Sequence, residues 1–121
     1  MKVSKKILIA DDDDDVQDAV ATILEYYEFH VAKVKTKEDI VAAVTSFRPG
    51  LILLDGSLSG FPARRLCERL RGEELIKNIP IVLFSAAIDI KSLFKECGVC
   101  AYLEKPFELY ALVSIVSQHC K

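Results

Sequence analysis

Acidic, hydroxyl and basic side chains directly follow short apolar runs at four places in the sequence. They are Asp11 and Asp12 after the first run, Asp55 after the third, Ser85 after the fourth, and Lys105 with Pro106 after the fifth. Three carboxylates held within a few ångströms repel one another unless some are protonated or a cation lies among them. Carboxylate oxygens with water completing the shell suit Mg²⁺. The residues therefore predict a magnesium site, if the fold brings these positions together.

The apolar runs have the length of β-strands. They are Ile7–Ala10, Val31–Val34, Leu51–Leu54, Ile81–Phe84 and Ala101–Leu103. Their nearly continuous apolar character is typical of strands covered on both faces. Between and after them, apolar residues recur at helical spacing. The residues expected to face the core are Val16, Val20, Ile23, Leu24 and Tyr27; Ile40, Val44 and Phe47; Ala63, Leu66, Cys67 and Leu70; Ile90, Leu93, Phe94 and Cys97; and Leu109, Leu112, Val113 and Val116.

Five strand–helix units in series predict an α/β fold. Right-handed crossovers make the strands parallel with helices on both faces, and five units are too few for an eight-stranded barrel. We expect a doubly wound five-stranded parallel sheet of order 2-1-3-4-5, flanked by five helices, as one domain over residues 1–121. In that order the first and third strands are neighbours, so the three carboxylates converge at the edge where such sheets bind ligands.

Composition excludes several classes of function. The net charge of −2 gives no general attraction to nucleic acid or to an anionic membrane, so neither is expected as a direct partner. The sequence contains no run of about 20 apolar residues and no signal-peptide core, and a cytoplasmic location is expected. The cysteines are expected to be free, half-buried thiols, because a cytosolic chain with an ample core needs no disulfides. They are Cys67, Cys97, Cys100 and Cys120.

The same segments resemble the receiver (CheY-like) domain of two-component response regulators. The matching pieces are ILIADDD, LILLD, PIVLFSA and YLEKPF, which stand in the family's order and spacing along the whole chain. No single piece is specific, because DD and KP occur in many proteins. The combination carries the resemblance, which implies a flavodoxin-like fold and a signalling role.

The resemblance implies a nucleophile and a metal site. Asp55 would accept a phosphoryl group from a phosphohistidine on a histidine kinase or phosphotransfer protein. Asp12, Asp55 and the backbone carbonyl of Ser57 would bind Mg²⁺ directly, and Asp11 mainly through water. A carboxylate is a competent nucleophile towards phosphorus, and phosphoryl transfer needs mostly positioning and charge neutralisation. The protein would therefore catalyse only its own phosphorylation and slow dephosphorylation, without being a classical enzyme.

The resemblance also implies a switch. Ser85 would hydrogen-bond the acquired phosphoryl group, and Lys105 would pair with it. The Lys105–Pro106 bond would be cis, and Tyr102 would be the aromatic residue whose rotamer reports activation. The added charge of about −1.5 to −2 gives Ser85 a group to move towards. This movement would change the face formed by the fourth and fifth helices. An unknown downstream protein would bind to this face, or a second copy of the chain would bind there after phosphorylation.

The loop after Asp55 departs from the family pattern. Receivers usually resemble MPGMDG there, whereas this chain reads LSGFPAR, with Ser59 for Pro, Pro62 for Asp and Ala63 for Gly. The usual acidic cap of the third helix is lost, which leaves the loop's conformation and kinase docking open. An alternative function follows from this loop: a degenerate receiver that works as a phosphorylation-independent protein-binding module.

Three further patterns in the sequence concern dephosphorylation, redox chemistry and surface charge. Ser57 and Ala87 occupy the positions that tune dephosphorylation in the family, and neither suits the alignment of an attacking water, so a phosphoryl lifetime of many minutes is predicted. A redox role for Cys97 and Cys100 is disfavoured, because a reactive first thiol belongs at a helix N-terminus. A basic cluster is interpreted as a solvated helix face. It consists of Arg64, Arg65, Arg69 and Arg71.

Overall fold

The computed structural model describes residues 5–56, 58, 63–85, 91, 95 and 99–120. Its strands are β1 (Lys6–Ala10), β2 (His30–Val34), β3 (Leu51–Asp55), β4 (Ile81–Ser85) and β5 (Ala101–Glu104). Its helices are α1 (Asp14–Tyr26), α2 (Lys37–Phe47), α3 (Ala63–Arg71) and α5 (Leu109–His119). The helix predicted around Leu93 falls mainly outside the described residues, so four of the five expected helices can be compared.

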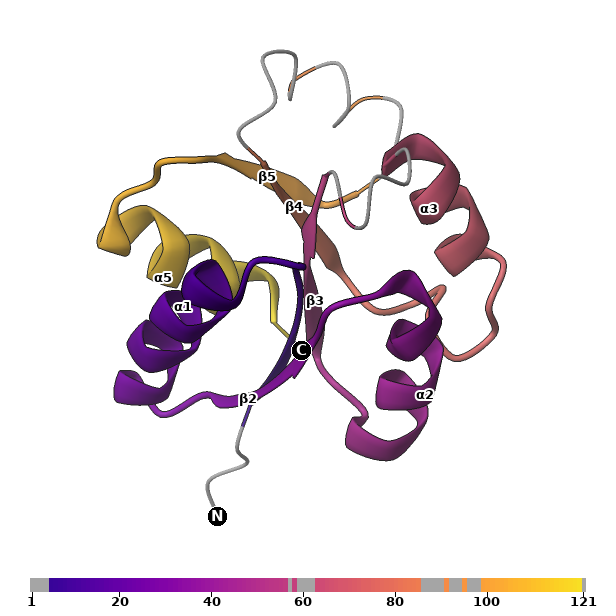
Figure 1. Ribbon diagram of the computed structural model, residues 1–121, viewed down its shortest axis with the longest axis horizontal. Coiled ribbons are helices and arrows are strands. Elements are labelled where there is room, and N and C mark those ends of the chain that lie inside the picture. The colour runs from indigo at the N-terminus through magenta and orange to yellow at the C-terminus, as the bar shows by residue number, and fades with distance from the viewer. Residues whose placement is uncertain are drawn as a thin grey trace.

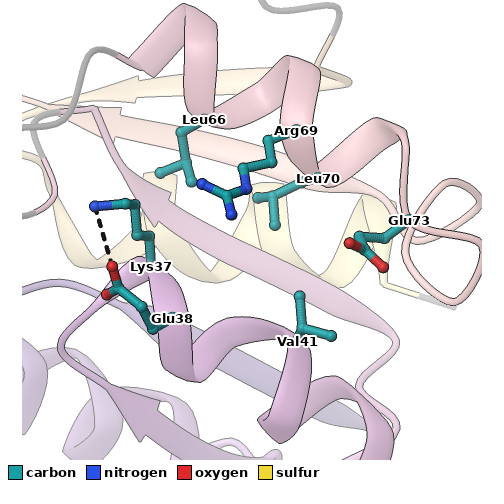
Figure 2. A pocket seen from close by; sticks show the side chains of 7 residues that line it. All are labelled: Lys37, Glu38, Val41, Leu66, Arg69, Leu70 and Glu73. Atoms are coloured by element: carbon teal, nitrogen blue, oxygen red, sulfur yellow. Dashed lines mark ion pairs between the residues drawn. The ribbon is translucent and has the colours of Figure 1, made fainter.

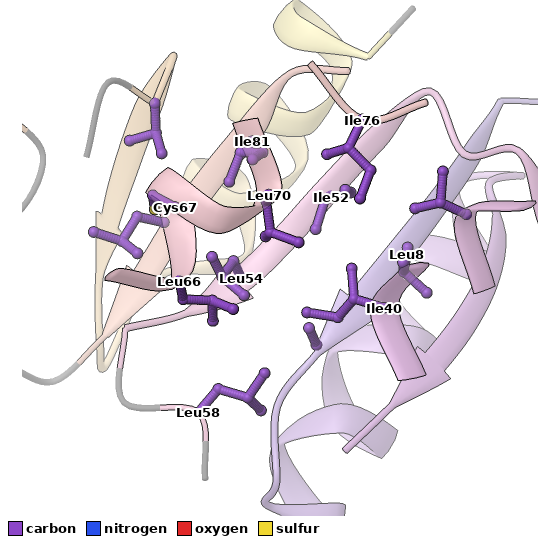
Figure 3. Packing of buried hydrophobic residues seen from close by; sticks show 14 residues of the cluster. Leu8, Ile40, Ile52, Leu54, Leu58, Leu66, Cys67, Leu70, Ile76 and Ile81 are labelled. Carbon is purple, nitrogen blue, oxygen red and sulfur yellow. The ribbon is translucent and has the colours of Figure 1, made fainter. Parts of the chain in front are cut away.

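All five strands are parallel and lie in the order β2-β1-β3-β4-β5, which confirms the predicted doubly wound sheet. Helices α1 and α5 cover one face, and α2 and α3 cover the other (Figure 1). The alternation of side chains along each strand divides the core accordingly. Ile7 and Ile9 of β1 pack under α1 and α5, whereas Leu8 packs under α2 and α3 (Figure 3).

Helix α1 begins at Asp14, inside the run of five aspartates from Asp11 to Asp15. The Asp13 carboxylate accepts hydrogen bonds from the backbone N–H groups of Asp15 (2.9 Å) and Val16 (3.2 Å), which makes it the N-cap. Acidic side chains in the first turn also suit the positive end of the helix dipole. A local cap at Asp13 therefore fixes the start of α1.

The predicted apolar faces match in the middle of the helices and fail at two ends. Leu24 and Val44 are buried as expected, and so is Leu112. Tyr27, however, lies beyond the end of α1 with 41% of its surface exposed, and Leu109 at the start of α5 is 42% exposed. Both stand at the end of a helix, so the apolar spacing continues there although the side chains are exposed.

The cysteines differ in exposure more than the sequence suggested. Cys67 and Cys120 are buried and Cys100 is exposed, whereas Cys97 lies outside the described residues. Within the part of the chain that the structure describes, no helix is long and apolar enough to cross a membrane.

Candidate functional site

The sheet brings the three predicted carboxylates together at the carboxyl ends of its central strands. β1 pairs directly with β3, with Ala10 opposite Leu54, so Asp11 and Asp55 leave neighbouring strands at the same level. Oxygen atoms of Asp11, Asp12 and Asp55 lie within 4.8 Å of one another. Asp11 and Asp55 are buried, while Asp12 is exposed and opens the group to solvent.

Asp11 is held by contacts to three other parts of the chain. Its backbone N–H donates to the carbonyl of Val34 at the end of β2 (3.1 Å). Its Oδ1 accepts from the N–H of Asp13 (2.9 Å), and its Oδ2 accepts from the Lys105 ammonium (3.0 Å). Both oxygens of a fully buried carboxylate are thus occupied, as burial of a charged group requires.

Lys105 carries the positive charge of the site. It follows β5, its backbone N–H donates to the Ser85 carbonyl (2.9 Å), and its peptide bond to Pro106 is cis. The ammonium nitrogen lies 3.0 Å from Asp11 Oδ2 and 3.5 Å from Asp55 Oδ1. It also lies 4.4 Å from the centroid of the Phe84 ring. One lysine therefore reaches from the fifth strand to carboxylates of the first and third.

Ser85, the last residue of β4, is buried against the backbone just after Asp55. The N–H of Gly56 donates to the carbonyl of Phe84 (3.1 Å). A Cβ atom on Gly56 would come within 3.0 Å of Ser85 Cβ and 3.1 Å of its Oγ. The hydroxyl can take this place because residue 56 has no side chain.

The remaining predicted site residues lie elsewhere or cannot be placed. Tyr102 is half-buried in β5 and packs against the core under α2 and α3. Ser57 lies outside the described residues, and so does Ala87. The structure therefore describes neither the expected backbone ligand nor the two positions that tune dephosphorylation.

The donor set fits a hard divalent cation. All three candidate ligands are carboxylates, the oxygen donors that Mg²⁺ prefers. Lys105 pairs with both Asp11 and Asp55, and its single charge by itself does not balance three carboxylates. Exposed Asp12 gives such an ion a route of entry that buried Asp11 and Asp55 alone would not.

The family model for the response regulator receiver domain matches residues 7–117. The chain belongs to this family. Receiver domains of two-component systems bind Mg²⁺ in an acidic pocket, and this chain has an acidic cluster of Asp11, Asp12 and Asp55.

Similar proteins agree with this assignment. The phosphate regulon transcriptional regulatory protein PhoB of Pseudomonas aeruginosa is 33% identical over 114 residues, which are 93% of this chain and 50% of that protein. The DNA-binding response regulator MtrA of Mycolicibacterium smegmatis is 32% identical, over 93% of this chain and 49% of that protein. The chain therefore spans about half the length of these relatives.

Solved structures show the same fold. A protein of Chloroflexus aurantiacus described as a response regulator superposes with a TM-score of 0.87 at 30% identity, covering 96% of this chain and 97% of that one. The receiver domain of a signal transduction histidine kinase from Syntrophus aciditrophicus gives 0.84 at 26% identity, covering 95% and 89%.

Two residues near the receiver site were not singled out from the sequence. Gln17 of α1 is buried, and its side-chain amide donates to the Val34 carbonyl (2.6 Å), which also accepts from Asp11 N–H. A polar residue three positions before buried Val20 was the available signal. Phe84 stands out in the sequence only as the last residue of an apolar run, and no local pattern marks its contact with Lys105.

A hollow elsewhere on the receiver is separate from this site. It holds about 240 Å³ between α2 and α3, and Val41 and Leu70 are among its lining residues (Figure 2). The Lys37–Glu38 ion pair (3.1 Å) also belongs to its lining. Asp11, Asp12 and Asp55 are not among its lining residues, so the hollow is separate from the carboxylate cluster.

Proposed function

We propose that this receiver accepts a phosphoryl group on Asp55 in a Mg²⁺-dependent reaction and thereby switches a partner-binding surface. One observation carries the proposal. The Lys105 ammonium lies 3.0 Å from Asp11 and 3.5 Å from Asp55, two members of a group of three carboxylates whose oxygens lie within 4.8 Å of one another. This arrangement combines a nucleophile, cation ligands and a fixed positive charge at the sheet edge where such folds bind ligands.

In the proposed reaction, a carboxylate oxygen of Asp55 forms a bond to phosphorus as the bond from phosphorus to the donor's histidine nitrogen breaks. The electron pair of the broken bond stays on the imidazole nitrogen, which then takes up a proton. Lys105 supplies positive charge beside the oxygens of the transferred group, and Ser85 supplies a hydroxyl hydrogen bond to it. When bound by Asp11, Asp12 and Asp55, Mg²⁺ would neutralise charge on the phosphoryl oxygens.

The proposed donor is a histidine kinase or a phosphotransfer protein, and the output goes through a downstream protein. The names of PhoB and MtrA describe transcriptional regulation and DNA binding by those longer proteins. The receiver itself has a net charge of −2, which favours protein partners over direct contact with nucleic acid. A single receiver domain over residues 1–121, in the cytoplasm, remains the prediction from the sequence.

Intact-mass spectrometry after incubation with acetyl phosphate and Mg²⁺ tests the proposal. We expect a gain of one phosphoryl group that disappears when Mg²⁺ is chelated and in Asp55→Asn. Asp39→Asn, a change of the same kind in the first turn of α2, is the matched control and should still gain the group. No gain in the unaltered protein, under conditions where Mg²⁺ binds, would refute phosphorylation and support the constitutive binding module suggested by the altered loop.

The lifetime of the phosphoryl group is measured on the same sample. Ser57 and Ala87 lead us to expect loss over many minutes once acetyl phosphate is removed. A half-life of a few seconds would contradict this expectation without affecting the assignment of Asp55.

A further inference from the structure

A row of residues crosses the sheet directly below the site. In the parallel register, Asp55 of β3 stands beside Phe84 of β4, which stands beside Leu103 of β5. Neighbours in a parallel register point to the same face of a sheet. Phe84 and Leu103 accordingly pack in one core cluster, under α1 and α5. Lys105 lies two residues beyond Leu103, so it leaves the strand on that same side.

The Lys105 side chain therefore has to pass over Phe84 to reach Asp55. Adjacent strands are about 4.8 Å apart, which puts β3 and β5 roughly 10 Å apart across β4. The ammonium completes this reach, ending 3.5 Å from Asp55 Oδ1 and 4.4 Å from the centroid of the Phe84 ring. A cation this close to an aromatic ring is attracted by the negative charge density of the ring face.

The ring is itself fixed in place. Phe84 is fully buried, and Phe107, just after Pro106, packs edge-on against it with centroids 6.3 Å apart and planes at 67°. An aliphatic side chain could fill much of the same volume, but it has no quadrupole to attract an ammonium group. The contact with Lys105 is therefore a property of the aromatic ring that burial alone does not supply.

We propose that Phe84 is a positioning residue for Lys105: its ring keeps the ammonium group beside Asp55 when a divalent cation occupies the carboxylates. The inference rests on the proposed function. A divalent cation bound by Asp11 and Asp55 weakens their attraction for Lys105, because it offsets most of the charge of the three carboxylates. The ring is uncharged, so its attraction for the ammonium persists when the carboxylates bind a metal ion.

This role predicts that a weaker ring contact strengthens Mg²⁺ binding and, at the same time, slows phosphorylation. A weaker ring contact lets Lys105 move away from the carboxylates, so Mg²⁺ meets less repulsion and binds more tightly. The same movement takes positive charge away from the incoming phosphoryl group, so phosphorylation of Asp55 becomes slower. A residue that only supports the fold would, when altered, weaken Mg²⁺ binding and slow phosphorylation together.

Two kinds of variant test the proposal. Phe84→Leu removes the ring, and stepwise fluorination of Phe84 weakens the ring's quadrupole while keeping its shape. The same fluorinated residues at Phe29, which is buried in the same core cluster, control for fluorine in the core. Titration calorimetry gives the Mg²⁺ dissociation constant, and intact-mass kinetics with acetyl phosphate gives the phosphorylation rate.

We expect Phe84→Leu to lower the Mg²⁺ dissociation constant and the phosphorylation rate, each by about three- to tenfold. Each added fluorine atom at Phe84 should lower the Mg²⁺ dissociation constant and the phosphorylation rate further. Fluorination at Phe29 should change neither quantity. In a Lys105→Met background, Phe84→Leu should leave the Mg²⁺ dissociation constant unchanged, because the effect acts through the lysine.

Weaker Mg²⁺ binding in Phe84→Leu, or an equal effect in the Lys105→Met background, would overturn the proposal. If Phe84→Leu does not fold, the test depends on the fluorinated proteins alone. A Mg²⁺ dissociation constant and a phosphorylation rate that do not change with the number of fluorine atoms would then refute the proposal. If the unaltered protein binds Mg²⁺ but gains no phosphoryl group, the proposed function fails; unchanged Mg²⁺ affinity across the fluorinated series then overturns the role of Phe84 separately.

Discussion

Replacing Lys105 by Met would remove the cation that holds two buried carboxylates while keeping most of the side chain's volume. The side chains of Asp11 and Asp55 are only 1% and 7% exposed, and that of Lys105 is 19% exposed. The variant leaves three carboxylates within 4.8 Å of one another without this cation. We therefore expect a large loss of stability in the absence of metal.

The magnitude follows from the two contacts, at 3.0 Å and 3.5 Å. Each amounts to on the order of 5 kcal/mol of Coulomb energy at an effective dielectric constant near 20, before desolvation is subtracted. Breaking a buried ion pair by removing one partner typically costs about 3–5 kcal/mol. Protonating an ordinary aspartate at pH 7 costs about 4 kcal/mol, which limits the penalty because a carboxyl can escape by that route. We expect a loss near 3 kcal/mol, or about 10 °C in Tm.

The assay is urea denaturation of Lys105→Met and the unaltered receiver, each with and without Mg²⁺. Mg²⁺ should bind the variant at least about tenfold more tightly and restore much of the lost stability, since it replaces the missing charge. Lys77→Met is the control, because the Lys77–Glu74 pair (2.8 Å) is exposed and such pairs contribute less than about 1 kcal/mol. A metal-free variant within about 1 kcal/mol of the unaltered receiver would refute this account of the site's electrostatics.

Three further predictions concern stability. Asp13→Ala should cost about 1 kcal/mol in urea denaturation because α1 loses its cap; Thr36→Ala, at an N-cap that forms no side-chain capping bond, should cost less. Gly56→Ala should cost about 1–3 kcal/mol, because the new Cβ would lie 3.0 Å from Ser85 Cβ, and unchanged stability would contradict that contact. Burial raises the pKa of the Cys120 thiol above its ordinary value of 9.0, so the native state keeps a proton that the unfolded chain has lost. The free energy of unfolding should therefore fall as pH rises above about 9, by at most about 1.4 kcal/mol per pH unit from this group, and Cys120→Ala should flatten the slope.

Local signals in the sequence were enough to predict the sheet and the convergence of the carboxylates. Strands covered on both faces must be apolar along their whole length, so runs such as Leu51–Leu54 can be recognised as strands from the sequence. Parallel strands with right-handed crossovers leave few possible orders, and each puts the strand ends at one edge. The cap of α1 is equally local, because Asp13 bonds to groups two and three residues away.

Other features were decided only by the tertiary structure. Tyr27 and Leu109 continue apolar helical patterns but are exposed at the ends of their helices. Gln17 is buried because its amide meets the Val34 carbonyl, 17 residues away. Such outcomes depend on where an element stops covering its neighbour, which helical spacing does not encode.

The arrangement around Lys105 shows most clearly which features the sequence determines and which the tertiary structure decides. The sequence by itself determined that a lysine follows the fifth strand and an aspartate ends the third. That the lysine lies over Phe84 and pairs with Asp11, 94 residues away, was decided by the register of four parallel strands, β1, β3, β4 and β5. Register between strands separated by crossover helices is fixed by the packing of both sheet faces together, and no single segment carries that information.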